Sequence, residues 1–243
     1  MKLRTLGSLA PRLTLLRVAS AMSSLAFPQH SASGGNLLRP GAAQQVQPGP
    51  GQQSVWDPPF TRPPSIRDVS GRLVQIRIGE EGPVILESTS AVQVCETSHP
   101  PTWYFPKADV QMGHLRRLGG NTFCEFKGTA SYYDIMSSPT GANSKESPLL
   151  PQGAWTYDRT ETSEIEGRLA FYLRPPLVAY VDGKRATPQQ GDFYGGWITD
   201  DVVGPFKGGP GSRYWYPGAI GESDSLLGGR RLQKLNDLPH LDF

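Results

Sequence analysis

Glycine and proline interrupt this chain so often that few segments can form a long helix. The 243 residues include 28 glycines and 23 prolines, about a fifth of the chain. Glycine costs backbone entropy in a helix and proline removes a backbone donor, so both residues favour turns. The fraction is still below that of low-complexity chains. We therefore expect a folded domain of many short elements joined by turns.

Short runs of alternating hydrophobicity predict strands. Within residues 72–78, Val74, Ile76 and Ile78 line one face of an extended segment, and polar residues line the other. Comparable apolar or aromatic runs predict further strands at 84–86, 91–95, 103–105, 121–127, 129–136, 154–157 and 177–181.

The remaining segments suit turns, loops and one or two short helices. Residues 108–118 could form a helical turn or two and 163–170 a short helix. Residues 137–152 are predicted as a polar loop, and Asp182-Gly183 as a hairpin turn. Strands and helices do not alternate as in parallel α/β folds. The sequence therefore predicts a mostly β fold: a compact, antiparallel, two-sheet single domain, tent-like or barrel-like, with one or two short helices.

The net charge of +2 conceals an uneven distribution. The first 56 residues carry five basic and no acidic side chains, so the remainder is net negative. A basic, acid-free, serine-containing leader is typical of an organelle transit peptide. The basic residues of the remainder are scattered except Arg230-Arg231, so we expect no nucleic-acid binding. No apolar run reaches the ~18 residues of a membrane span.

A helix over residues 3–17 would be amphipathic, with four leucines on one face and arginines opposite or at its flank. Pro11 would weaken its middle. A secretory signal is the competing interpretation, but Arg12 and Arg17 interrupt the apolar core that such a signal needs. A third interpretation is a disordered tail that translation from Met22 would bypass. We expect a chloroplast or mitochondrial protein, with the cytoplasm as the alternative.

Composition divides the chain into six segments. They are a transit peptide (1–33), a disordered linker (34–54), an extended proline-rich arm (55–70), a β core domain (71–183), a glycine- and aromatic-rich extension packed on that core (184–218), and a tail (219–243).

Several segments, in their order and spacing, resemble the family called domain of unknown function 427. They are VCETSHPPTWYFPKADV (94–110), FCEFKGTASYYDI (123–135), AWTY (154–157), FY (171–172) and VAYVDG (178–183). The segment GGWITDDVVGPFKGGPGSRYW (195–215) resembles an extension found on cyanobacterial, plant and algal members. The resemblance covers about residues 70–216 and implies a compact, largely β fold related to tent-like two-sheet folds.

The resemblance implies little about chemistry. Some proteins of that fold group bind zinc through paired CxxC motifs, and this sequence has none. The family also carries a nucleotidyltransferase-like label, an activity that normally needs a Gly-Ser pair followed by a metal-binding Asp-x-Asp pair. Asp200 and Asp201 are adjacent, so in a strand they would point to opposite faces. No cofactor can be assigned from these residues.

Glu96 and His99 are the first candidate site residues. They follow the predicted strand 91–95, and loops at strand ends often display functional residues. His99 could act as an acid or base that Glu96 orients. The alternative is a structural network in which Glu96 caps turn amides and His99 packs against Trp103.

Lys127 is the third candidate. In the predicted strand 121–127 it shares a face with Glu125, and Cys124 lies on the other face with Phe126. Lys127 suits an anion site or a Schiff base, and the alternative is a surface ion pair. Cys124 fits a buried, apolar-like residue better than a nucleophile.

Tyr104, Tyr132 and Trp197 are candidate walls of a ligand pocket, with core packing as the alternative. Lys207 lies in GPFKGGPGS (204–212), whose glycine amides could hold an anion. This segment lacks the spacing of a phosphate loop, so a tight turn is the alternative. No metal site is expected, because a Cys95, His99 and Cys124 set lacks a paired ligand motif.

The sequence thus favours a soluble β domain that binds a small polar or anionic ligand near Glu96, His99 and Lys127. Catalysis stays open; in an enzyme, His99 would be the acid or base and Lys127 the electrostatic stabiliser or nucleophile. The competing hypothesis is a non-catalytic interaction module whose aromatic extension forms an interface, for example between the subunits of a homo-oligomer.

Overall fold

A computed structural model describes residues 46–139, 146–191, 193–209 and 212. The chain divides into two units, 1–34 and 35–243, and every described residue belongs to the second. The transit peptide, most of the linker, the end of the extension and the tail, as predicted from the sequence, lie outside the described residues. Within the described ranges, no helix is long and apolar enough to cross a membrane.

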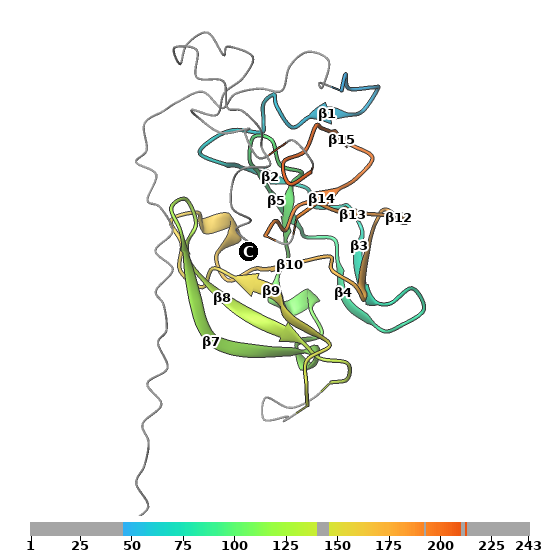
Figure 1. Cartoon of the computed structure of the whole chain (residues 1–243), viewed down its shortest axis with the longest axis vertical. Helices are drawn as coiled ribbons and strands as arrows, with labels where there is room; N and C mark the ends of the chain where they lie inside the picture. The colour runs from blue at the N-terminus through green and yellow to red at the C-terminus, as the bar shows by residue number, and fades with distance from the viewer. Residues whose placement is uncertain (1–45, 140–145, 192, 210–211, 213–243) are drawn as a thin grey trace, which may run out of the picture. The chain divides into compact units, whose positions relative to one another are not determined.

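Strands dominate the described residues (Figure 1). One four-stranded sheet has the order β10 (Leu169–Phe171), β9 (Leu150–Thr156), β8 (Gly128–Ile135) and β7 (Leu115–Cys124). The other has the order β12 (Lys184–Arg185), β11 (Leu177–Val181), β3 (Val74–Ile78) and β4 (Val84–Ser88). A three-stranded sheet contains β2 (Ser65–Asp68), β5 (Val92–Cys95) and β6 (Thr102–Tyr104).

Among the described residues, two short strand pairs and three helical turns complete the fold. β13 (Thr187–Pro188) pairs with β14 (Trp197–Ile198), and β1 (Gln53–Ser54) pairs in parallel with β15 (Val202–Val203). The 3₁₀ turns are η2 (Lys107–Asp109), η3 (Met112–His114) and η4 (Ser163–Ile165). The predicted mostly β, antiparallel class is confirmed, and its strands are divided among more than the two predicted sheets.

The alternation of apolar and polar residues in 72–78 predicted a strand, and β3 lies within this segment. β3 pairs with β4 on one side and β11 on the other, and Val74 and Ile76 are completely buried. The predicted turn at Asp182-Gly183 joins β11 to β12, with φ values of 52° and 78°. Two positive φ values in succession are typical of a tight hairpin turn, which explains the glycine.

Four segment predictions were wrong in their bounds. Residues 108–118 form two 3₁₀ turns and then enter β7 at Leu115, and 163–170 form η4 followed by the start of β10. The loop predicted over 137–152 ends before β9, which begins at Leu150. The linker predicted over 34–54 includes the paired residues of β1. In each case hydrogen bonds to distant strands determine the structure, and local composition does not report them.

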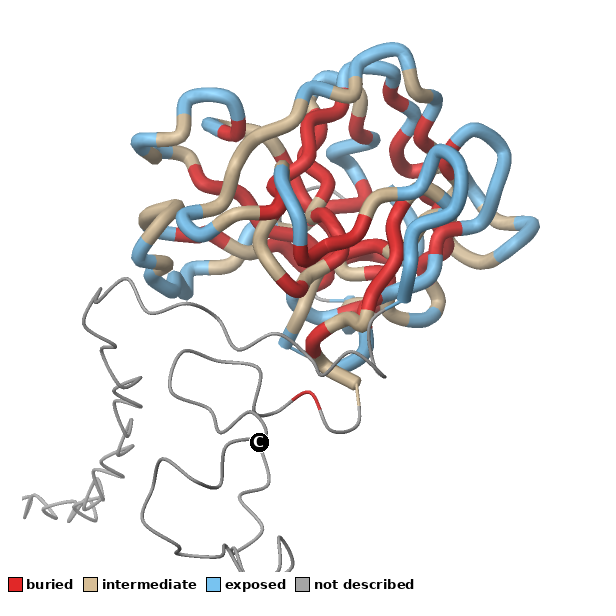
Figure 2. The backbone as a smooth tube through the Cα atoms, turned by 90° about the horizontal axis from the view of Figure 1, so that it is seen from above, coloured by how far each residue is buried: buried red, intermediate tan, exposed pale blue. Residues whose placement is uncertain are grey.

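The buried side chains form a main core and two smaller clusters, with exposed residues on the outer loops (Figure 2). The main core contains side chains from both four-stranded sheets together with Trp103 and Phe105. The extension also enters this core, because Trp197 is 1% exposed and stacks on Trp103 with ring centroids 5.9 Å apart. The extension is therefore part of the folded unit.

Candidate functional site

The loop after β5 carries Glu96 and His99 and is fixed from two sides. The backbone N–H of Ser98 donates to the carbonyl of Val55 at 2.9 Å, and the Ser98 carbonyl accepts the N–H of Lys207 at 2.8 Å. Ser98 is 1% exposed and has a φ of 71°. The loop thus joins the arm to the extension, and this positions His99.

His99 is held by a glutamine from the extension. Nε2 of Gln189 lies 2.9 Å from Nδ1 of His99 and 2.7 Å from the carbonyl oxygen of Lys207. A carbonyl only accepts hydrogen bonds, so the group facing it is the amide N–H₂ of Gln189. Its second N–H then points to Nδ1, which must accept. The neutral ring consequently carries its proton on Nε2.

The pKa of His99 is lowered to about 4, so the ring is neutral at pH 7. Burial of the ring is the largest cause, and the positive charges of Lys207 and Lys127 lower it further. Glu96 and the Gln189 hydrogen bond act in the opposite direction. These couplings show that Glu96, Lys127 and Lys207 all lie within electrostatic range of His99.

The charged groups around His99 differ in their partners. Glu96 lies 4.0 Å from Arg62, which forms a closer ion pair with Glu125 at 2.9 Å. Lys127 is half-buried and forms no hydrogen bond or ion pair with any residue that the structure describes. Lys207 is 6% exposed. The neighbourhood therefore combines two lysines with a neutral histidine, and its one carboxylate is close to an arginine.

The strand faces predicted for Cys124 to Lys127 were wrong. β7 ends at Cys124, residues 125–127 form a turn, and β8 begins at Gly128 with a φ of 82°. Alternation therefore does not apply to Glu125 and Lys127. The turn lies at the tip of the β7–β8 hairpin, and Arg62 stacks on the Phe126 ring at 5.2 Å. This hairpin tip brings Lys127 near His99.

Tyr104 and Tyr132 belong to a group that we call the tyrosine cluster, with Tyr157 and Tyr172. Tyr104 and Tyr157 lie in the second hydrophobic cluster, and Tyr132 and Tyr172 pack against it. The Tyr104 hydroxyl accepts the Trp155 indole N–H at 3.2 Å, and the Tyr132 hydroxyl lies 2.6 Å from the Thr122 hydroxyl. Tyr157 is 5% exposed, and its hydroxyl has no hydrogen-bond partner among the described residues.

The cluster is linked electrostatically to the His99 neighbourhood and to Cys124. Burial raises the pKa of Tyr104 far above its usual range, and the charges of Cys124 and Glu96 act in the same direction. Burial also raises the pKa of Tyr172 to about 12. Tyr104, Tyr157 and Tyr172, whose pKa values burial raises, are thus neutral at pH 7 and can only donate or accept hydrogen bonds.

Cys95 lies apart from Cys124, in the third cluster with Trp56 and Phe60. Burial raises the pKa of the Cys95 thiol to about 11, which makes it a poor nucleophile at pH 7. Both cysteines are free. Across the described residues, no three His, Cys, Asp or Glu side chains come close enough to hold a metal ion.

The two other candidates occupy interior positions. The Trp197 indole N–H donates to the Phe171 carbonyl at 3.0 Å, and the ring is enclosed by the main core. In the glycine-rich loop, the Gly208 N–H donates to the Ser212 hydroxyl at 2.8 Å, and the Lys207 N–H is bonded to Ser98. These amides are engaged within the protein, as expected for a tight turn.

The adjacent aspartates form ion pairs with different partners. Asp200 pairs with Lys184 at 2.8 Å, and Asp201 pairs with Arg72 at 2.9 Å and Arg67 at 3.6 Å. The Asp201 carboxylate thus ties the extension to the core. These pairs do not form the two-aspartate metal site of nucleotidyl transfer.

Sequence reasoning missed two residues of the site, Gln189 and Tyr194. Gln189 bonds to His99 from 90 positions away, and the Tyr194 ring lies 5.0 Å from the His99 ring. Both belong to the extension, where only the glycine and aromatic content attracts attention. No local pattern indicates such a long-range polar contact.

Comparison with known proteins gives one family. Residues 68–184 match the family model described as a domain of unknown function (DUF427). No curated protein matches the chain. The match includes Glu96, His99, Lys127 and the tyrosine cluster, whereas Gln189, Tyr194 and Lys207 lie beyond it. Residues 68–184 therefore form a domain of the DUF427 family.

Proposed function

We propose that the residues around His99 bind a small anionic ligand. The observation that carries the proposal is the neutral His99 ring, held by Gln189 within electrostatic range of Lys127 and Lys207. Its Nε2–H is a hydrogen-bond donor with no partner among the described residues. A donor beside two cationic side chains favours an anion, because charge-assisted hydrogen bonds are the strong ones.

Lys127 would supply the principal charge. It is half-buried and unpaired within the described residues, and partial burial strengthens its attraction to an anion. The Glu96 carboxylate opposes this attraction, but Arg62 lies close enough to offset part of its charge. The hydroxyls of the half-buried Tyr132 and Tyr172 would bind polar atoms at the uncharged end of the ligand.

In this proposal His99 donates a hydrogen bond and does not accept a proton. A general base needs an unprotonated nitrogen that faces the substrate, and Nδ1 already accepts the Gln189 N–H. A neutral imidazole can polarise a ligand oxygen through Nε2–H. The arrangement therefore supports the binding of an anion. If the protein is an enzyme, the His99 Nε2–H would act as an electrophile that polarises a substrate oxygen.

Inorganic phosphate is the probe for this site. We expect the His99→Ala, Lys127→Ala double variant to bind phosphate at least about tenfold more weakly than the wild type, because charge-assisted hydrogen bonds contribute about 1.5–3 kcal/mol. Calorimetric titration measures the affinities, and mass spectrometry of small molecules that co-purify with each protein identifies a natural ligand. Lys107→Ala is the control, since Lys107 forms a separate ion pair with Asp158. Equal binding by the double variant and the wild type would contradict the proposal.

A non-catalytic interaction module is the second candidate function. Phe193 is 74% exposed in the extension, beside the ring of Tyr194 at 5.4 Å. An exposed aromatic side chain often anchors a partner surface. Self-association that Phe193→Ala abolishes, without any phosphate binding by the wild type, would favour this candidate.

We further propose that residues 1–33 direct the chain to an organelle. The support is their basic, acid-free composition. The mature protein in its native cells should begin beyond residue 33, as read by N-terminal sequencing. Recovery of the intact Met1 terminus from the cytosol would refute this assignment.

A further inference from the structure

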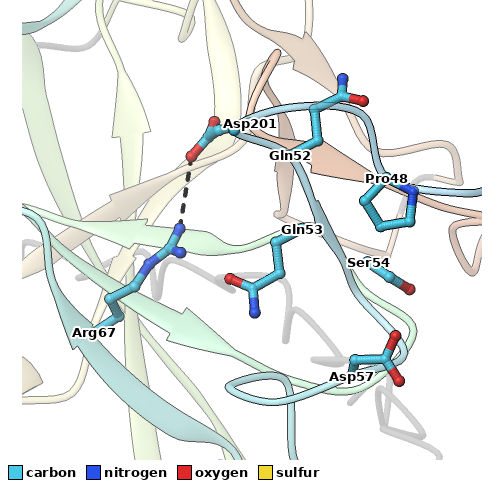
Figure 3. Close-up of a pocket in the computed structure, with 8 residues that line it drawn as sticks. Pro48, Gln52, Gln53, Ser54, Asp57, Arg67 and Asp201 are labelled. Carbon is cyan, nitrogen blue, oxygen red and sulfur yellow. Dashed lines mark ion pairs between the residues drawn. The ribbon is translucent and has the colours of Figure 1, made fainter.

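A polar cavity lies between residues 48–57 and the Asp201 region, and it shares no lining residue with the His99 neighbourhood. Its volume is about 340 Å³. The lining residues are Pro48, Gly51, Gln52, Gln53, Ser54, Asp57, Arg67 and Asp201. Figure 3 shows Arg67 and Asp201, joined by their ion pair, on one side of the cavity, and Ser54 and Asp57 on the other. Asp201 lies beyond residue 184 and all the other lining residues precede position 68, so the family match includes none of them.

Several polar groups of the lining are already engaged within the protein. The Asp201 carboxylate accepts hydrogen bonds from Arg72 at 2.9 Å and from the Thr199 hydroxyl. The Gln52 side chain accepts the Gly49 N–H at 3.0 Å and donates to the Asp200 carbonyl at 2.9 Å. The Gln53 amide donates to the Pro58 carbonyl. These groups therefore hold the walls of the cavity in place through contacts within the protein.

Arg67 keeps donors that the protein does not use. Its Nε and Nη2 donate to Oε1 of Gln93, and Nη2 lies 3.6 Å from Asp201, too far for a hydrogen bond. The two N–H groups on Nη1 have no partner among the described residues. The guanidinium carries a full positive charge, so these donors favour a carboxylate.

Two further lining groups complement a donor on the ligand. The Gln53 Oε1 atom accepts no hydrogen bond from any described residue, because only its amide nitrogen is engaged. Asp57 adds an exposed carboxylate to the same lining. Acceptors and a negative charge opposite a guanidinium suit a ligand that carries both charges. A volume of 340 Å³ is at the small end of ligand pockets.

We propose that this cavity binds a small α-amino acid. The ligand carboxylate takes the Nη1 donors of Arg67, and the ligand ammonium faces Gln53 Oε1 and the Asp57 carboxylate. Because the ammonium and carboxylate of an α-amino acid are held on one carbon atom, both interactions are made together. A simple carboxylate or a simple amine would make only one of them.

Titration of the full-length protein with L-alanine tests the proposal, with binding followed by NMR at the backbone amides of residues 51–54. We expect a dissociation constant on the order of 1 mM. Propionate lacks the ammonium and L-alaninamide lacks the carboxylate, so each should bind at least about tenfold more weakly. Equal binding of propionate and L-alanine, or no shift of these amides with L-alanine, would overturn the proposal.

Asp57→Asn is the first variant, since Asp57 is exposed and the change preserves its size. It should weaken L-alanine binding about three- to tenfold, and Glu81→Gln, which changes an exposed turn carboxylate outside the cavity lining, should leave it unchanged. Arg67→Met should abolish detectable binding, and a circular dichroism spectrum and melting curve establish that this variant is folded. Wild-type affinity in both Asp57→Asn and a folded Arg67→Met would refute the assigned contacts.

Discussion

Replacing Trp197 with alanine is expected to lower the free energy of unfolding by about 3–5 kcal/mol. Trp197 is 1% exposed, and its ring lies 5.9 Å from Trp103 and 5.6 Å from Phe105 between centroids. The substitution would leave a cavity in the main core and remove the hydrogen bond to the Phe171 carbonyl. Urea unfolding followed by far-ultraviolet circular dichroism measures the loss, since tryptophan fluorescence changes with the substitution itself.

Phe193→Ala is the matched control for Trp197→Ala. Both residues are aromatic and belong to the extension, but Phe193 is 74% exposed. Its removal should change the free energy of unfolding by about 0.5 kcal/mol or less. If Trp197→Ala is no more destabilising than Phe193→Ala, the extension is an appendage of the domain and not part of its core.

The alternation of apolar residues was sufficient to locate strands whose two faces differ in burial. β3 is the clearest case, because Val74 and Ile76 are fully buried and Gln75 and Arg77 are not. β7 shows where this reasoning fails. Its sequence, LRRLGGNTFC, does not alternate, and most of its residues are exposed. Pairing with β8 makes it a strand, and that pairing includes a bulge between Arg117 and Asn121.

The candidate site was predictable only in part, because chemistry is easier to recognise in a sequence than spatial proximity. Glu96, His99 and Lys127 were selected for their side-chain types and their positions near strand ends, and the electrostatic couplings place them in one neighbourhood. The protonation state of His99 depends on burial and on Gln189, 90 residues away. Neither the burial of His99 nor its contact with Gln189 can be recognised in the local sequence. The sequence therefore suggested that His99 is an acid or base, whereas in the structure its ring is oriented as a hydrogen-bond donor.

Trp197 was predicted as a pocket wall, but in the structure its ring lies in the main core. Its aromatic ring in a glycine-rich segment suggested a pocket wall, because sequence alone does not distinguish a ring that faces a ligand from one that faces the core. The adjacent glycines are instead explained by packing. A side chain at Gly195 would lie 2.2 Å from the Trp155 ring, and one at Gly196 would lie 2.4 Å from the Pro100 carbonyl oxygen. They let the extension approach the core closely.

Acidification is expected to destabilise the protein through His99 by about 2–3 kcal/mol between pH 7.5 and pH 4.5. The pKa of His99 is about 4 in the folded protein, against an ordinary value of 6.5. As the pH falls below 6.5, the unfolded chain takes up this proton and the folded protein does not, so the unfolded state gains stability. The loss is spread over the window from pH 6.5 to about 4 and levels off below it. Urea unfolding at a series of pH values measures it.

The His99→Gln variant isolates this contribution from the carboxylates that titrate in the same range. Glutamine does not titrate, and its carbonyl oxygen can accept the Gln189 N–H that His99 Nδ1 accepts now. The difference in unfolding free energy between wild type and variant should therefore shift by about 2–3 kcal/mol toward the variant as the pH falls from 7.5 to 4.5. A constant difference would mean that His99 titrates normally in the folded state. It would then be available as a base at neutral pH, and the hydrogen-bond-donor role proposed for it would be wrong.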